Sequence, residues 1–293
     1  MFVVILKYIF SRFNIDVLQL PKNDGSVKST YYNAYYKSVG RSAAYNGIKV
    51  INTLNNKVWC GKGVNAYSCA LNDKQFIMDF SDYTPLQLNP KDFKVPYFKW
   101  HYSIKVLTYP YNVYPLCILQ DYDFEEFARV RLQVMYTATG SLITNNQRPV
   151  SGAKERRTMV QQMLTAAYKS DVSTTFIPQK TWWMSHDDCL VSVAVPGARN
   201  DMLDRGQLEL MGLGVCVISP MITTVLMGHR TLISYMHYIA VKPDYSDLIK
   251  TINWCQTHRE QCQTFGINAR NLFDKVATPS VYWEYIKRIL DAK

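Results

Sequence analysis

The stretch covering residues 197–248 constrains the fold of this chain more than any other. It opens on a glycine turn that leads to Arg205, continues through a short helical segment with Glu209, and enters the apolar run 215–219. A second strand pattern follows at 238–241. A glycine turn, a helix and apolar strands in this succession are typical of a parallel sheet covered by helices. The sequence therefore predicts an α/β fold with a Rossmann-like sheet in its carboxyl-terminal half.

Length and composition fit two lobes. The chain has 293 residues, of which 48% are hydrophobic, and this is enough for two cores of ordinary domain size. An acidic stretch at 121–129 marks the expected boundary. We therefore expect a first lobe over residues 1–125, a second over residues 126–277 and a last helix over residues 278–293.

The formal net charge of +10 suits an anionic partner, which could be a phosphorylated small molecule, an acidic membrane or a nucleic acid. The basic residues are scattered, and the densest group is Lys154, Arg156 and Arg157 around Glu155. Such scattering argues against a nucleic-acid groove. The apolar start of the chain is too short to span a bilayer. We expect neither a nucleic-acid partner nor a membrane span.

The cysteines and histidines indicate neither a disulfide framework nor a metal site. Seven cysteines, an odd number, show no regular spacing, which favours a reducing, cytoplasmic compartment. The sequence contains no CxxC pair and no Cys/His quartet, and its five histidines lack metal-ligand spacing. We therefore expect no metal.

Two helix starts in the second lobe could bind a phosphate group. Gly140 closes an expected strand at 132–137 and is followed by Arg156 at a helix start, and Gly197 is followed in the same way by Arg205. A strand, a glycine turn and a helix together offer amide dipoles and cations to a diphosphate. Neither turn has the GxGxxG or GxxxxGK[ST] pattern of dinucleotide oxidoreductases and P-loop kinases. Each arginine taken alone could equally be a surface residue.

Three carboxylates are candidates for a role in a site. Glu209 could lie on the solvent face of its helix or hold the ribose hydroxyls of a nucleotide. Asp79 and Asp82 lie at the end of the strand pattern 74–80, where α/β sheets place their ligands. A fixed carboxylate there could act as a general base, whereas the alternative for Asp82 is an Asx-type turn before the proline that follows.

The segment HYIAVKPDYSDL at 237–248 closely resembles the His-Tyr-(Ile/Val)-Pro-Val-Lys-x-Asp-(Leu/Tyr)-Ser-(Asp/Asn)-Leu segment of glycosyltransferase family 90. This family includes the Rumi-type protein O-glucosyltransferases and the fungal capsule-associated xylosyltransferases. The likeness runs in order through most of the chain from about residue 45 onward, with Ala240 where the family prefers proline. The stretch from Glu209 into 215–219 is also similar to the exostosin-type transferases, in which such a glutamate binds the nucleotide ribose.

The resemblance gives roles to residues of this chain. Arg205 falls at the arginine of the family's Gly-Val-Ala-Ala-Ser-Phe-Arg segment. Gly140 with Arg156 is similar to the family's Phe-Arg-Gly and Glu-Arg-Asp pair. The segment QFIMDFSDYTP is similar to a strand ending in Asn-x-Arg-Asp-Tyr-Pro, which puts Asp82 on the aspartate that serves as the catalytic base.

The chain also departs from the family. Asp79 replaces the asparagine and Ser81 the arginine of the Asn-x-Arg-Asp segment, and Ala138 and Thr139 replace the arginine before Gly140. These departures keep an alternative open, which is an inactive protein of the same fold that binds a nucleotide sugar or a glycan.

The resemblance implies a GT-B architecture, in which two Rossmann-like lobes face each other across a cleft and the helix 278–293 packs back on the first lobe. Residues 126–277 would bind a UDP-sugar, with UDP-xylose preferred to UDP-glucose, and no further cofactor would be required. The residues expected at this donor site are Gly140, Arg156, Gly197, Arg205 and Glu209.

The resemblance also implies the reaction. Asp82 of the acceptor-side lobe would deprotonate a hydroxyl group of a glycan or glycoprotein, in an inverting transfer for which the arginines replace a metal. A chain this short, with unpaired cysteines and no signal peptide, looks like a relative from a large DNA virus of algae, a chlorovirus, that glycosylates its own capsid in the host cytoplasm.

Overall fold

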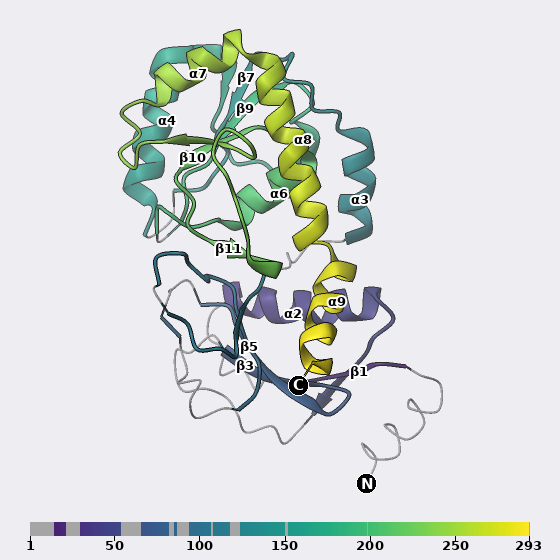
Figure 1. The fold of residues 1–293 in the computed structure, drawn as a ribbon. Coiled ribbons are helices and arrows are strands. Elements are labelled where there is room, and N and C mark those ends of the chain that lie inside the picture. Colours follow the sequence, from purple (N-terminus) through teal and green to yellow (C-terminus); the bar gives the residue numbers. More distant parts are fainter. Residues whose placement is uncertain are drawn as a thin grey trace. The chain divides into compact units, whose positions relative to one another are not determined.

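The computed structural model of the chain describes residues 15–21, 30–53, 66–81, 85–86, 94–106, 108–117, 124–149, 152–197 and 199–292. The chain divides into two compact units. Unit 1 comprises Met1–Tyr122, Val225–Arg230 and Val276–Lys293, and unit 2 comprises Asp123–Thr224 and Thr231–Lys275. Each unit is built on a sheet with helices packed on it, so the predicted α/β class is confirmed (Figure 1).

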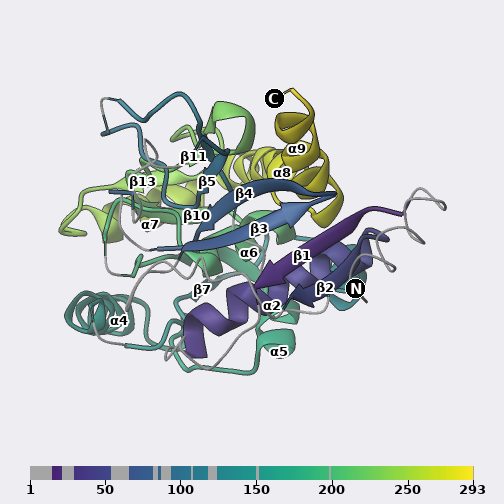
Figure 2. The same cartoon turned by 90° about the horizontal axis from the view of Figure 1, so that it is seen from below.

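Unit 1 is built on a six-stranded sheet in the order β2-β1-β3-β4-β5-β6. Figure 2 labels β1 to β5 of this sheet. Its elements are β1 (Val17–Pro21), α2 (Thr30–Tyr45), β2 (Lys49–Thr53), β3 (Ala66–Leu71), β4 (Lys74–Asp79), β5 (Tyr97–Lys99), β6 (Val113–Pro115), β11 (Val225–Leu226), the 3-10 turn η3 (Met227–His229) and α9 (Pro279–Asp291). β1 and β2 are parallel, as are β4, β5 and β6, whereas β3 runs antiparallel to β1 and β4.

The sheet of unit 1 is mixed rather than wholly parallel. The reason is a tight hairpin between β3 and β4, whose two turn residues, Asn72 and Asp73, have φ values of 49° and 67°. A two-residue connection can only join antiparallel neighbours. The parallel strands that follow still give unit 1 a carboxyl edge at β4 and β5.

The last helix, α9, completes the core of unit 1. Trp283 is buried and its Nε1 donates to Oγ of Ser42 on α2 at 3.0 Å. Tyr282 is buried against β4, with its hydroxyl 4.0 Å from Sδ of Met78. Proline at the start of α9 suits the first helical turn, because no intrahelical partner exists there for the missing N–H.

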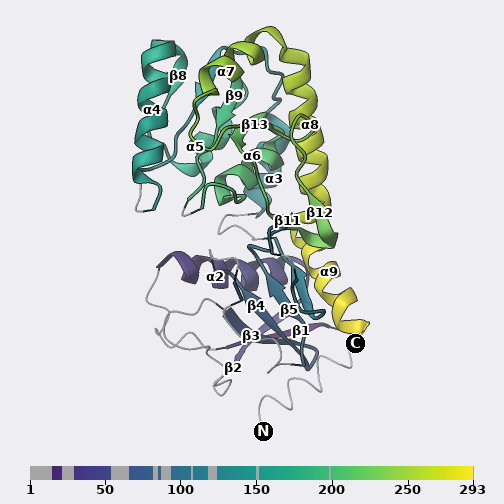
Figure 3. The same ribbon diagram turned by 60° about the vertical axis from the view of Figure 1, so that its left-hand side comes forward.

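Unit 2 contains a wholly parallel five-stranded sheet in the order β13-β10-β9-β7-β8. Its elements are α3 (Phe124–Gln133), β7 (Leu142–Thr144), α4 (Lys154–Tyr168), η2 (Lys169–Asp171), β8 (Val172–Ser173), α5 (Gln179–Met184), β9 (Cys189–Val193), α6 (Arg205–Leu213), β10 (Val217–Pro220), β13 (Ile239–Val241), α7 (Leu248–Thr257) and α8 (Arg259–Val276), with the short β12 (Arg230–Thr231) at its border. Helix α4 lies on one face of the sheet, with α7 beside it, and α8 lies on the other (Figures 1 and 3).

The strand order of unit 2 defines where a ligand can bind. Numbered along the chain, the five strands lie in the order 2-1-3-4-5, and the direction of winding reverses between β7 and β9. Loops leaving these two strands diverge to opposite faces, which leaves a crevice at their carboxyl ends. In open α/β sheets this is the place where ligands bind.

The start of unit 2 corrects one prediction. The segment 132–137, expected to be a strand, begins inside α3 and continues without regular structure, and β7 starts only after Gly140. Phe127 and Val130 follow a helical spacing and are buried, with the Phe127 ring against Trp183 at 4.9 Å. Burial of this helical face outweighs the strand-like alternation that follows it.

Two expectations from the sequence concern membrane-spanning helices and the state of the cysteines. Across the described ranges, no helix is both long and apolar enough to cross a bilayer. The six described cysteines are buried thiols, and Cys60 lies outside the described residues.

Candidate functional site

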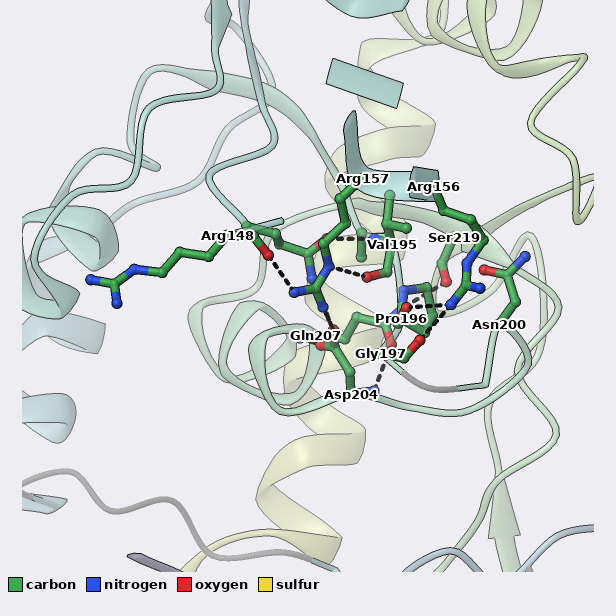
Figure 4. A network of polar contacts seen from close by, with 12 residues as sticks. Arg148, Arg156, Arg157, Val195, Pro196, Gly197, Asn200, Asp204, Gln207 and Ser219 are labelled. Atoms are coloured by element: carbon green, nitrogen blue, oxygen red, sulfur yellow. Dashed lines mark hydrogen bonds and ion pairs between the residues drawn. The ribbon is translucent and has the colours of Figure 1, made fainter. Parts of the chain in front are cut away.

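The carboxyl edge of the unit 2 sheet collects a network of polar side chains at the crevice between β7 and β9 (Figure 4). The loop after β7 supplies Gln147 and Arg148, the loop after β9 supplies 194–197, and the first turn of α4 supplies Arg156 and Arg157. These segments surround the position at which the strand order predicts a ligand.

Arg157 holds this edge together. Its Nε donates to the carbonyl of Val195 at 3.1 Å, and its Nη1 donates to the carbonyl of Arg148 at 2.8 Å. Its Nη2 lies 3.5 Å from Oδ2 of Asp204, just before α6. The side chain is only 9% exposed, so its charge is used inside the protein. Arg157 therefore ties the β7 loop, the β9 loop and the start of α6 to one another.

The start of α6 is already capped by a carboxylate. Asp204 accepts the backbone N–H of Gln207 at 2.9 Å, and Oε1 of Gln207 accepts the backbone N–H of Asp204 at 2.8 Å. This reciprocal pair is a capping box. Gln147 adds a contact from Nε2 to Oδ2 of Asp204 at 2.8 Å and accepts the N–H of Val195 at 2.6 Å. An added anion at this helix start would have to compete with Asp204.

The start of α4 is open by comparison. Its N-cap residue, Ala153, offers no side-chain hydrogen bond to the first amides. Arg156 lies in this first turn, where its Nη2 donates to the carbonyls of Pro196, at 3.3 Å, and Gly197. Its Nε has no hydrogen-bond partner among the described residues. Uncapped amides and a guanidinium with an unused donor are what an anionic group requires.

Arg205 and Glu209 come together on α6. Arg205 is the first residue of that helix and is half-buried, and Glu209 follows one turn later with only 2% exposure. Oε2 of Glu209 accepts from Nε1 of Trp183 at 2.8 Å, and both carboxylate oxygens accept from Nε2 of Gln179 at 3.2 Å. Glu209 therefore does not lie on a solvent face. Its carboxylate is instead enclosed by α5.

Burial makes the carboxyl group of Glu209 an unusually weak acid. Removal from water raises the pKa of its carboxyl group from 4.5 to about 7, although the Trp183 hydrogen bond and the positive charge of Arg205 both lower the pKa. A carboxyl group with this pKa changes its charge near neutral pH.

Gly140 lies at the opposite edge of the sheet from Arg156, because it precedes β7 rather than following a strand. A Cβ atom at this position would meet the carbonyl oxygen of Asp188 at 2.0 Å. Its own carbonyl accepts from Nη1 of Arg259 at 2.6 Å. The structure therefore corrects the predicted phosphate turn at Gly140, whose glycine is explained by close backbone packing.

Of the remaining predicted residues, the structure describes Gly197 and Asp79 but not Asp82. Gly197 meets Arg156 at the crevice through its carbonyl group. Asp82 lies outside the described residues. Asp79, three residues earlier, is buried at the end of β4.

The segment 237–248, which carries the family resemblance, is anchored inside unit 2 by Tyr245. Tyr245 is buried, and its hydroxyl lies 3.5 Å from the carbonyl of Ala194 and 3.2 Å from Oδ1 of Asn200. Nδ2 of Asn200 donates in turn to the carbonyl of Pro243 at 2.7 Å. This segment therefore supports the loop after β9, beside the crevice.

Sequence reasoning did not find Arg157, Gln147, Asp204 or Trp183 as parts of this network. Asp204 and Gln207 do carry a local signal, because Asp-x-x-Gln before an apolar run fits a capping box. The partners of Arg157 and Glu209 lie on other elements, and no local pattern identifies them. Among the described residues, no group of three or more His, Cys, Asp or Glu side chains could hold a metal ion.

Comparisons with known proteins give distant similarities. No family model matches the chain. A 92-residue segment is 27% identical to uncharacterized protein 179R of Invertebrate iridescent virus 6 and covers 29% of this chain and 8% of that protein. Among solved structures, HepE of Anabaena in complex with UDP and glucose aligns with a TM-score of 0.48 and 11% identity, over 70% of this chain and 65% of that chain. Sucrose-phosphate synthase of Thermosynechococcus elongatus aligns with a TM-score of 0.37 and 17% identity, over 58% of this chain and 44% of that chain.

In each of these comparisons the match spans less than two thirds of the other protein. The similarities are too distant to place the chain in a family. A function for this chain therefore has to be argued from its own residues.

Substitutions of the two adjacent arginines should have different effects on the free energy of unfolding. Arg157→Met should lower the free energy of unfolding by about 1–3 kcal/mol, because it leaves the buried carbonyl of Val195 without its partner and removes the cation beside Asp204. Arg156→Met should change it by less than about 1 kcal/mol, since the Arg156 side chain is half-exposed. Urea unfolding of both variants measures the difference. Equal losses of stability would contradict the role of Arg157 in tying the two loops and the start of α6 together.

Glu209 predicts a pH-dependent stability. Between pH 4.5 and about 7 the folded protein keeps a proton on this carboxyl that the unfolded chain has released. Stability should therefore fall as pH rises through this window and level off above it. Relative to Glu209→Gln, which cannot titrate, the wild-type protein should lose about 3 kcal/mol over the window. Parallel curves of unfolding free energy against pH for the two proteins would refute the raised pKa.

Proposed function

We propose that this chain is a glycosyltransferase that moves a sugar from a UDP-sugar to a hydroxyl group of a glycan or glycoprotein. The observation that carries the proposal is the open start of α4 at the crevice between β7 and β9, with Arg156 beside it. A diphosphate fits such a place because it is an anion with several acceptor oxygens. The resemblance of residues 237–248 to glycosyltransferase family 90 supports the sugar as the other half of the donor.

The proposed donor site lies in unit 2. The first amides of α4 and the unused Nε of Arg156 take the diphosphate, with Arg205 as the second cation. Glu209 can take the ribose hydroxyls only if they replace Gln179 or Trp183 as its hydrogen-bond donors. Xylose in preference to glucose follows from the resemblance alone, as does a viral capsid protein as acceptor, whereas a cytoplasmic location also rests on the unpaired cysteines.

The proposed reaction is an inverting displacement in a GT-B arrangement. The carboxylate of Asp82, in unit 1, takes the proton of the acceptor hydroxyl, and the acceptor oxygen forms a bond to the anomeric carbon of the donor. The bond between that carbon and the β-phosphate oxygen breaks, and UDP leaves with the electron pair. Arg156 and Arg205 stabilise the negative charge on the departing diphosphate without a metal.

A second candidate is a nucleotide-sugar-binding protein that catalyses no transfer. The observation that favours it is the departure of this chain from the family segments at several positions, among them Asp79, Ser81 and Ala138. Donor hydrolysis or transfer separates the two candidates, since a protein that only binds shows neither.

UDP affinity tests the donor site. Arg156→Ala and Arg205→Ala should each weaken UDP binding about 10- to 100-fold, because each removes a charge-assisted hydrogen bond to phosphate. Calorimetry with UDP measures the affinities. Arg129→Ala, which removes an exposed arginine from α3 of the same unit, serves as the control and should bind UDP like the wild type. Unchanged affinity in the Arg156 variant would remove that residue from the site.

Transfer activity tests the base. A panel of UDP-sugars is first screened for thermal stabilisation, and the best donor is then used in hydrolysis and transfer assays. Asp82→Asn should lower turnover by about 10²- to 10⁴-fold, because the amide cannot accept the acceptor's proton. UDP affinity should stay within about threefold of the wild type, since the proposed donor contacts come from unit 2. Full turnover by this variant would exclude Asp82 as the base.

A further inference from the structure

A buried ion pair lies at the carboxyl edge of the unit 1 sheet. Nζ of Lys99 is 3.1 Å from Oδ2 of Asp79, and neither side chain has any exposed surface. Asp79 ends β4 and Lys99 ends β5, and the parallel register places the two residues directly opposite each other. The hydroxyl of Tyr97 donates to Oδ2 of Asp79 at 2.6 Å.

Stability does not explain this pair. A buried ion pair loses the hydration of both charges, and well-packed apolar residues of similar volume stabilise a core as well or better. The register of the two strands does not require the pair either, because backbone hydrogen bonds fix it on both sides. Ile77 N–H donates to the carbonyl of Pro96 at 2.9 Å, and Trp100 N–H donates to that of Asp79 at 2.9 Å.

The pair does something that apolar side chains cannot do, which is to hold Ser81. The backbone N–H of Ser81 donates to Oδ1 of Asp79 at 2.9 Å. Nζ of Lys99 donates to Oγ of Ser81 at 2.6 Å and to its carbonyl oxygen at 3.4 Å. Amide, carbonyl and hydroxyl of this one residue are therefore all bound by the two charged side chains. Ser81 itself is completely buried.

We propose that Asp79 and Lys99 are a positioning pair, which fixes Ser81 at the end of β4 and so fixes the backbone to which the next residue, Asp82, is joined. The inference rests on the proposed role of Asp82 as the general base. A general base must be held within about 0.5 Å of its productive place, and a misplacement of about 1 Å can cost about 100-fold in rate. Asp79 and Lys99 are too deeply buried to touch a substrate, so they act through Ser81.

The same contacts connect two departures from the family segment. An aspartate at 79, in place of asparagine, gains a charged partner in Lys99. A serine at 81, in place of arginine, offers Lys99 a compact acceptor. Each substitution is explained by the same lysine, which lies 18 residues from Ser81 in the sequence.

The test replaces the pair without leaving a buried charge alone. Asp79→Leu combined with Lys99→Met removes both charges and with them the partners of the Tyr97 hydroxyl and of Ser81, so its thermal midpoint should lie below that of the wild type. Asp79→Asn combined with Lys99→Met is the second variant and keeps the shape at position 79. The matched control is Lys74→Met combined with Asp291→Leu, which removes an exposed pair at the other end of β4, where the side chains are 48% and 71% exposed.

Two measurements are made on each protein. Hydrogen exchange of a peptide covering residues 80–86 should become at least about tenfold faster in both pair variants and stay unchanged in the control. With the best UDP-sugar as donor, kcat should fall about 100-fold while KM for the donor stays within about threefold. Loss of kcat together with faster exchange at this peptide supports the positioning pair.

Other results decide against it. Pair variants with wild-type kcat, or with unchanged exchange at 80–86, overturn the proposal. A wild-type protein that neither transfers nor hydrolyses any UDP-sugar refutes the proposed function, and with it a catalytic purpose for the pair. The exchange measurement then still shows separately whether the pair holds Ser81.

Discussion

Backbone amides and carbonyls at the end of a parallel strand need new hydrogen-bond partners once the neighbouring strand turns away. In unit 2 this need is greatest where the loops after β7 and β9 diverge. Gln147 and Arg157 meet it by binding both backbone polar groups of Val195, and Arg157 reaches the carbonyl of Arg148 as well. These contacts tie the two loops together without a ligand, and such pre-organisation lowers the entropic cost of binding.

Neighbouring charges at this edge have separate tasks. Arg157 donates only to acceptors of the protein that the structure describes, whereas the preceding residue, Arg156, keeps an unused donor among the described residues. Asp204 fills the start of α6, which leaves the start of α4 as the better place for an anion. A net charge of +10 gives no hint of this division, since it depends on which groups face each other after folding.

Much of the fold could be predicted because apolar runs of strand length identify buried strands. The runs at 74–80, 215–219 and 238–241 correspond to β4, β10 and β13. The strand β7 lies in a mostly polar stretch that gives no such pattern, and Gly140 was misplaced as a result. The site was harder to predict because its partners are distant in sequence. Trp183 and Glu209 are 26 residues apart, and neither reveals the other.

The interleaving of the two units has a consequence for the order in which the protein is made. The chain passes between the units four times, and α9 joins unit 1 after all of unit 2. Trp283 meets Ser42 across 241 residues, and Tyr282 meets Met78 across 204. During synthesis on the ribosome, the core of unit 1 therefore stays incomplete until α9 emerges. Unit 2 can complete its core before then. Unit 1 is begun first and finished last, and its exposed apolar surface during that wait is where a chaperone is most needed.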